Sequence, residues 1–462
     1  MGRIGRRGTP VTSYILLGLF GASCILLIAD GMKRRTGIYE FSFLAGCGLF
    51  GFLFTQAVGV VRSPGMAPEA GVWKALIMSS LCAAAVYLGW KSTTPKRKEP
   101  RIPSPFQLKW IYRLGVVAII IGVIGAVGTA RLHGGVLGIN VALGRHIVVY
   151  RGMPVVYYFF SVYGYLGLVL VASVALRLRS WLLAAPAAIP VLYALSNIFV
   201  AGRRNEFVLL GVAAGTLVYF ATGITPPRLC AAIVAPLAMA AMFFAPIYRQ
   251  YTLNQRWEQV GQLSVSEAVG RALSGSEGEF WTEAYEMEIA DTEHMFQFGI
   301  GFYNSFIQYF VPKLIVGEAF KQKLYLPVPA ARYDNNHQSW SYPDGMVPTG
   351  PFSVFEQFWY FGAICFYWLA KWLKRHWVLA LEGDFLSALI YCVTVTGAVA
   401  AVTNDIYAIY PPLFMFVIPL RLFAKMQLGM RRLAQTYPDA SAFAPRRTQN
   451  TATTHGHRVE VR

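Results

Sequence analysis

Apolar runs of about 19 residues or more recur along this chain and restrict its fold more than any other feature. A helix of that length crosses roughly 30 Å of hydrocarbon, whereas the strands of a membrane barrel have about 10 residues of alternating polarity. Only 14% of the residues are charged, against about 25% in a typical soluble domain. The sequence therefore predicts an all-α fold, a polytopic transmembrane helical bundle of about eleven spans. The predicted spans are 11–29, 37–61, 72–90, 109–130, 154–176, 181–200, 205–222, 229–247, 352–370, 384–402 and 406–424.

A polar segment of about 100 residues, 248–349, interrupts these apolar runs. Connections of this length are usually functional or disordered, and this one contains Trp, Tyr, Phe and short helical patterns. We expect a partly helical loop that folds over the membrane surface and covers a site there. The predicted regions are 1–247, N-terminal transmembrane helices; 248–350, the large loop; 351–425, C-terminal transmembrane helices; and 426–462, a basic, disordered cytoplasmic tail.

Basic residues orient the predicted helices, because short loops rich in Lys and Arg lie on the cytoplasmic side. The clearest such loop is 91–101. Placing it inside puts the loop 248–349 outside, by alternation of the spans. The arginines near the N-terminus then lie outside, against the rule, so the orientation of the N-terminus stays open.

The formal net charge of +18 has a structural explanation in this frame. Much of it is the basic bias of the inner loops, together with a tail that meets anionic lipid. Nucleic-acid binding is a poor explanation for a polytopic membrane protein. The sequence has no metal-ligand cluster and no cofactor motif, and its six cysteines stand singly, without CxxC spacing. We therefore expect no metal and no cofactor.

A second set of basic residues falls on the outer side of the same topology, at the ends of helices. Their forked donors suit phosphate or diphosphate, and the alternative is that they extend toward lipid phosphates. The segment 201–207 opens a helix, whose N-terminal N–H groups also favour anions. The candidate diphosphate-binding residues are Arg203, Arg204, Arg145, Arg151 and Arg249.

The end of the loop combines hydrogen-bonding and aromatic side chains, the mixture that sugar binding needs. The candidate sugar-binding residues are Arg332, Asn335, Asn336 and Trp340. His337 is a candidate general base, because its unperturbed pKa is near neutral; a loop histidine without a special role is the alternative. Glu356, in the first turn of the predicted span 352–370, is a candidate catalytic carboxylate by its membrane depth, and its alternative is an ion pair with an arginine. Asp405 occupies a similar position with less support.

Three segments resemble the bacterial O-antigen (Wzy-type) polymerases. They are the stretch 299–313, the stretch 349–362 with its Glu-aromatic-Phe-Gly pattern, and the turn Gly202-Arg203-Arg204. The chain departs from the family pattern at Lys313, where Arg is commoner, and at Ala363. The resemblance covers scattered segments rather than the whole chain.

This resemblance implies an inner-membrane glycosyltransferase, metal-independent by analogy, with its active site at the periplasmic face. It would polymerise undecaprenyl-diphosphate-linked oligosaccharide repeat units into O-antigen or a related surface polysaccharide, with membrane lipid and a chain-length regulator protein as candidate partners. Two alternatives stay open: the O-antigen ligase, which uses lipid A-core as acceptor, and a transporter or flippase for the same lipid-linked sugars. Transporters usually show internal repeats and short loops; no repeat is visible here, and the long loop counts against this alternative.

Overall fold

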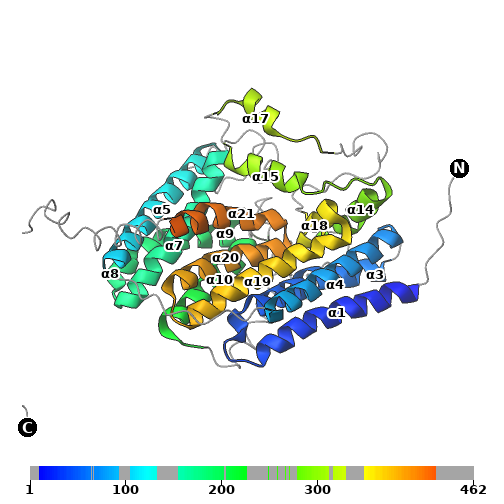
Figure 1. The fold of residues 1–462 in the computed structure, drawn as a ribbon, viewed down its shortest axis with the longest axis horizontal. Coiled ribbons are helices and arrows are strands. Elements are labelled where there is room, and N and C mark those ends of the chain that lie inside the picture. Colours follow the sequence, from blue (N-terminus) through cyan, green and yellow to red (C-terminus); the bar gives the residue numbers. More distant parts are fainter. Residues whose placement is uncertain are drawn as a thin grey trace, which may run out of the picture. The chain divides into compact units, whose positions relative to one another are not determined.

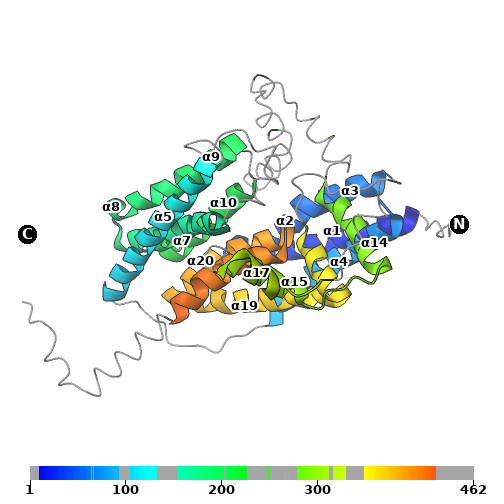
Figure 2. The ribbon, with the colours of Figure 1, turned by 90° about the horizontal axis from the view of Figure 1, so that it is seen from above.

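The computed structural model describes residues 10–63, 65, 67–92, 105–132, 155–201, 204–225, 248, 258, 266, 270, 278–311, 316–328 and 348–422. Within these residues every regular element is a helix, so the all-α prediction is confirmed there. One compact unit is Met1–Phe416, and Val417–Arg462 forms a second. The helices of the first unit are drawn in Figures 1 and 2.

The helices are α1 (Pro10–Met32), α2 (Phe41–Gly48), α3 (Thr55–Arg62), α4 (Glu69–Ser92), α5 (Pro105–Leu132), α7 (Val155–Leu178), α8 (Trp181–Ala184), α9 (Ala188–Ala201), α10 (Arg204–Thr222), α14 (Glu279–Thr292), α15 (Ile300–Phe310), α17 (Glu318–Leu324), α18 (Gly350–Phe358), α19 (Ile364–Leu381), α20 (Phe385–Thr403) and α21 (Tyr410–Pro412). Short 3-10 and π-helical turns connect several of them, and a π-helical turn at Leu49–Phe54 joins α2 to α3.

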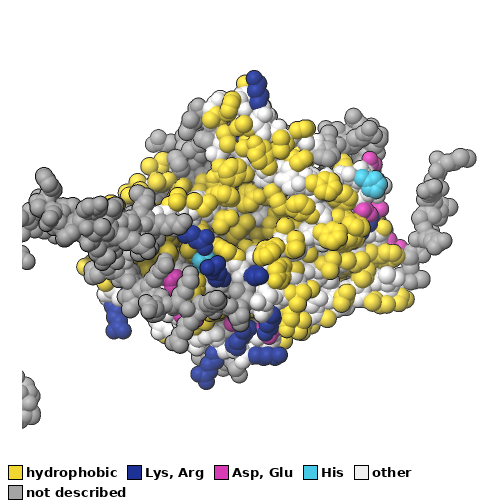
Figure 3. All heavy atoms as spheres, viewed as in Figure 1, with side chains coloured by type: hydrophobic (Ala, Val, Ile, Leu, Met, Phe, Trp, Pro, Cys, Tyr) yellow, Lys and Arg dark blue, Asp and Glu magenta, His cyan; other side chains and the backbone are white. Residues whose placement is uncertain are grey.

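Five helical segments in the described part of the chain are long and apolar enough to cross a membrane. They are Val11–Met32, Phe41–Arg62, Glu69–Ser92, Gln107–Gly128 and Phe385–Thr403. Each coincides with a predicted span. Apolar side chains also cover much of the surface in Figure 3. Ile15 and Leu19 of α1 and Ile120 of α5 are among the exposed apolar side chains. Long apolar helices with exposed apolar faces are typical of a membrane-embedded protein.

The other predicted spans have different outcomes. Three of them follow helices of the structure: α7 follows 154–176, α8 and α9 together follow 181–200, and α10 follows 205–222. The predicted span 229–247 lies outside the described residues. The predicted span 352–370 is wrong as one continuous helix, because α18 ends at Phe358 and α19 begins only at Ile364. The physical reason is a backbone reversal at Trp359, whose φ of +55° cannot continue a right-handed helix.

Close backbone contacts hold the helices together. A Cβ atom added to Gly71 of α4 would lie only 2.1 Å from the carbonyl oxygen of Ala284 in α14. The carbonyl oxygen of Val354 in α18 lies similarly against Gly362, at 2.0 Å. Any side chain at these positions would force the backbones apart, so glycine sets how closely the helices approach.

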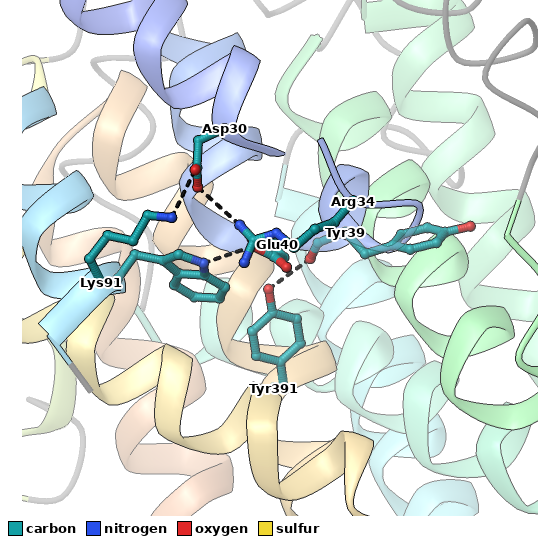
Figure 4. A network of polar contacts seen from close by, with 7 residues as sticks. Asp30, Arg34, Tyr39, Glu40, Lys91 and Tyr391 are labelled. Carbon is teal, nitrogen blue, oxygen red and sulfur yellow. Dashed lines mark hydrogen bonds and ion pairs between the residues drawn. The ribbon is translucent and has the colours of Figure 1, made fainter. Parts of the chain in front are cut away.

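A network of charged side chains joins the end of α1 to the start of α2 and the end of α4 (Figure 4). Arg34 contacts Asp30 at 3.0 Å and Glu40 at 2.7 Å, and Lys91 contacts Asp30 at 2.8 Å. The indole N–H of Trp90 donates to Glu40 at 2.7 Å. These carboxylates have cationic partners, which is the condition for holding charge away from water. The network marks the end of the bundle that precedes the basic loop 91–101.

Candidate functional site

The helix α14 is the described part of the long loop that packs most closely on the bundle, beside α3, α4 and α18 (Figures 1 and 2). Its buried face carries Phe280, Ala284, Met287 and Ala290, a helical spacing. At its start, the side chain of Gln56 in α3 accepts from the Phe280 amide and donates to Glu279, both at 2.9 Å. The prediction that the loop is partly helical is therefore confirmed for this segment.

The glutamates of α14 have different surroundings. Glu283 is buried, and its carboxyl accepts hydrogen bonds from Thr349 at 2.7 Å and Ser79 at 3.3 Å. Glu288 instead forms an ion pair with Lys74 of α4 at 2.8 Å. Burial raises the pKa of Glu283 to about 8, more than the two hydrogen bonds lower it. Glu283 is therefore a neutral group at physiological pH that ties α14 to α4 and α18.

The short helix α18 begins at a well-defined cap and ends at a strained turn. Thr349 is its N-cap, and its hydroxyl accepts from the Phe352 amide at 3.3 Å. At the other end, the amides of Gln297 and Phe298 donate to the carbonyls of Glu356 and Gln357 at 3.0 and 2.9 Å. The last carbonyl groups of α18 have no amide partner within the helix, and the amides of the 297–299 segment take that place.

Strain concentrates on both sides of this junction. Phe298 has a φ of +46° and Trp359 a φ of +55°, in the left-handed region that bulky residues rarely adopt. Residues held this way require support from their surroundings and cluster at functional sites. Phe298 and Phe361 are also among the most exposed aromatic residues, at 75% and 78%. An exposed aromatic rim thus borders the end of α18.

Glu356 stands at this junction, partly buried in the short helix α18, which is outside the five candidate spans. Its carboxylate accepts a close hydrogen bond from the side-chain amide of Gln297. No ion pair joins it to an arginine among the described residues, so the arginine-pair alternative finds no support there. Burial raises the pKa of Glu356 to about 7, and the charge of Asp405 adds to the rise, while the Gln297 hydrogen bond opposes it.

Asp405 is the second carboxyl of the site. It caps the turn after α20, accepting from the Tyr407 amide at 3.1 Å. Burial raises its pKa to about 6, and the Tyr407 amide lowers it less. Asp405 in turn raises the pKa of Glu356, so the two carboxyls influence each other's protonation. Such a pair is suited to accepting a proton from a hydroxyl group.

The remaining predicted site residues are mostly outside the described part of the chain. This holds for Arg203, Arg145, Arg151, Arg249, Arg332, Asn335, Asn336, His337 and Trp340. Arg204 is the first residue of α10, in agreement with a helix opening at this turn. The structure therefore places one predicted catalytic residue, Glu356, in a defined environment.

Sequence reasoning missed the two glutamines at this site, Gln297 and Gln357. Gln357 is fully buried although it is polar, which signals a structural or functional role. A usable sequence signal was its position next to Glu356 in the segment 349–362. Gln297 precedes Gly299 and Gly301, but its pairing with a residue about 60 positions later is not readable from local pattern.

The assembled site is a partly buried carboxyl pair beside an aromatic rim, under a helical loop. A carboxyl whose pKa is near neutral, as that of Glu356 is, can accept a proton from a hydroxyl group. No protein-family model matches the chain, and no curated protein and no solved structure matches it.

Proposed function

We propose that this chain is an inner-membrane glycosyltransferase that polymerises undecaprenyl-diphosphate-linked oligosaccharide repeat units at the periplasmic face. The observation that carries the proposal is the environment of Glu356. A carboxyl near neutral pKa lies within a segment that resembles the O-antigen polymerases, at the junction between loop and bundle. The membrane-embedded helices and the docked α14 support it, because a lipid-linked sugar needs both an apolar neighbour and a polar cover.

The proposed reaction transfers the growing chain from one carrier lipid to the sugar of another. A hydroxyl oxygen of the acceptor attacks the anomeric carbon of the donor, and its proton passes to the Glu356 carboxylate, or to His337 as the alternative base. The bond between that carbon and the diphosphate oxygen breaks, and its electron pair leaves with undecaprenyl diphosphate. Arg203 and Arg204 stabilise the departing charge, with Arg145, Arg151 and Arg249 as further candidates.

The position of the site along the helices supports a reaction at the periplasmic face. Lys74 of α4 contacts α14, whereas Lys91 of α4 joins the network with Asp30. Seventeen residues (91 − 74) of helix separate them, about 26 Å at 1.5 Å per residue. The loop helix and the basic end therefore lie near opposite ends of a membrane-spanning helix. If the basic end is cytoplasmic, α14 is periplasmic.

Cysteine labelling tests this orientation. In a cysteine-free background, an impermeant maleimide added outside the inner membrane should label Cys introduced at exposed Gln322 of α17. Cys at position 98, in the basic loop, should react only after that membrane is breached. The reverse pattern would reject the topology and the proposed function with it.

Deletion of the gene tests the function itself. A surface polysaccharide reduced to single repeat units is expected, because export and attachment continue while polymerisation stops. Loss of all surface attachment would instead identify the O-antigen ligase. Accumulation of the lipid-linked units on the cytoplasmic side would identify a transporter or flippase. Restoration by the plasmid-borne chain is the control.

A further inference from the structure

Two glutamine side chains connect the start of α15 to the carboxyl of Glu356. The side-chain oxygen of Gln357 accepts hydrogen bonds from the backbone amides of Gly299 and Gly301, each at 3.1 Å. The Gln357 side-chain nitrogen donates to the side-chain oxygen of Gln297 at 2.8 Å. The Gln297 nitrogen then donates to Glu356. The bonds thus form one chain from a glycine segment to the candidate base.

This chain of bonds determines which way each amide points. A backbone N–H can only donate, so the two glycine amides fix the oxygen end of Gln357. Its nitrogen end must then face Gln297 and fix the oxygen of that side chain. The nitrogen of Gln297 is left facing Glu356. The orientation of both amides therefore follows from the bonding partners rather than from their similar shapes.

The glycines make room for this arrangement. A Cβ on Gly301 would stand 2.2 Å from the Gln297 oxygen and 2.2 Å from the Gln357 nitrogen, a distance at which the neighbouring atoms would have to move. Gly299 has a φ of +89°, which a residue with a side chain rarely adopts. Gly299 and Gly301 open the stretch 299–313, so the glycines of that stretch have a defined task at the site.

We propose that Gln297 and Gln357 are positioning residues for Glu356: Gln357, oriented by the amides of Gly299 and Gly301, orients Gln297 so that it donates to the Glu356 carboxylate. This inference rests on the proposed catalytic role of Glu356. A donor aimed at the carboxylate favours its ionised form, the form that accepts a proton. Among the described residues, the other titratable groups facing Glu356 are Asp405 and Tyr407, and the carboxylate of Asp405 acts in the opposite direction.

Two substitutions break the chain of bonds at different points. Gln297→Leu removes the donor to Glu356 at a partly exposed position. Gln357→Leu removes the donor to Gln297, together with the oxygen that accepts from the Gly299 and Gly301 amides, without adding a charge beside Glu356, so the Gln297 amide is free to turn its oxygen toward Glu356. Gln322→Leu is the matched control, because it removes an exposed glutamine-to-glutamate hydrogen bond in α17.

The test measures two quantities in each purified, folded variant. One is the pH dependence of kcat with lipid-linked donor and acceptor. The other is the titration of the Glu356 carboxyl by infrared difference spectroscopy, assigned by its loss in Glu356→Gln. Both substitutions should raise the midpoint of the Glu356 titration by about one pH unit. The fall of kcat on the acidic side of its pH profile should shift upward by the same amount, and kcat should recover at high pH. Gln322→Leu should move neither.

The outcomes separate this inference from the proposed function. An unchanged Glu356 midpoint in both variants overturns the inference, whatever the turnover. A raised midpoint with an unchanged pH profile of kcat supports the orientation of the carboxyl by the glutamines but rejects Glu356 as the base. A uniform loss of kcat at every pH, with no shift of the midpoint, would show a purely structural effect and also overturns the inference.

Discussion

Replacing Glu356 with Gln is expected to lower polymer formation by about a hundredfold or more at neutral pH, if the proposed function holds. Gln keeps the shape of the side chain and removes its ability to accept a proton. The residue lies where α18 ends and is held by Gln297 beside Asp405, so an amide fits the space with little repacking. Turnover of purified protein on lipid-linked repeat units measures the effect, and binding of the carrier lipid, by photo-crosslinking, should survive.

The matched control is Glu283→Gln, a second buried glutamate at the loop–bundle junction. Glu283 is already neutral at physiological pH because burial raises its pKa to about 8, so an amide replaces a neutral carboxyl and turnover should stay within about twofold. Full activity in Glu356→Gln would remove this residue from the mechanism. Loss of lipid binding together with turnover would assign Glu356 to holding the binding site in shape.

Changing Arg203 or Arg204 to Ala is expected to abolish polymer formation while the protein remains in the membrane. Loss of a charge-assisted contact to the leaving diphosphate costs about 3 kcal/mol, roughly a hundredfold in rate. Lys should restore only part of the rate, because a bidentate fork becomes a point charge. Polymer length on gels and single-turnover rates measure the loss.

Arg177→Ala is the control for this pair. Arg177 lies in the last turn of α7, with its guanidinium over the ring of Phe385 at 5.3 Å, and it falls on the side predicted to be cytoplasmic. Its loss should leave turnover unchanged. Normal polymer from both Arg203→Ala and Arg204→Ala would show that these arginines contact lipid phosphates, and the diphosphate site would have to be sought elsewhere.

The long apolar helices were predictable from sequence because their cause is local. Runs such as Phe385–Thr403 must satisfy their backbone groups internally in hydrocarbon, so composition over about 20 residues is enough. The prediction of one continuous helix at 352–370 failed because the break in that helix has no local cause. Its composition is that of a span, but Trp359 has a φ of +55°, and the end of α18 just before it is hydrogen-bonded to the distant 297–299 segment. Window averages do not contain that information.

The same distinction applies to the acidic residues of α14. Glu283, Glu286 and Glu288 lie close together in the sequence, which does not say which of them is buried, and Glu283 faces inward with Ala284 and Met287. Glu283 can be buried because Ser79 and Thr349, both far away in the chain, donate hydrogen bonds to its carboxyl. Glu288 faces Lys74 for a similar reason.

By itself, the sequence determined that the chain is helical, that it has membrane-spanning segments, and that Glu356 is a residue to examine. These follow from hydrophobic length and from the cost of a carboxyl near membrane depth. Only the tertiary structure decided what surrounds Glu356. Gln297 reaches it from 59 positions away, and Asp405 from the far end of α20. Such contacts form because the folded backbone brings distant donors to one carboxyl, and no local pattern encodes that distance.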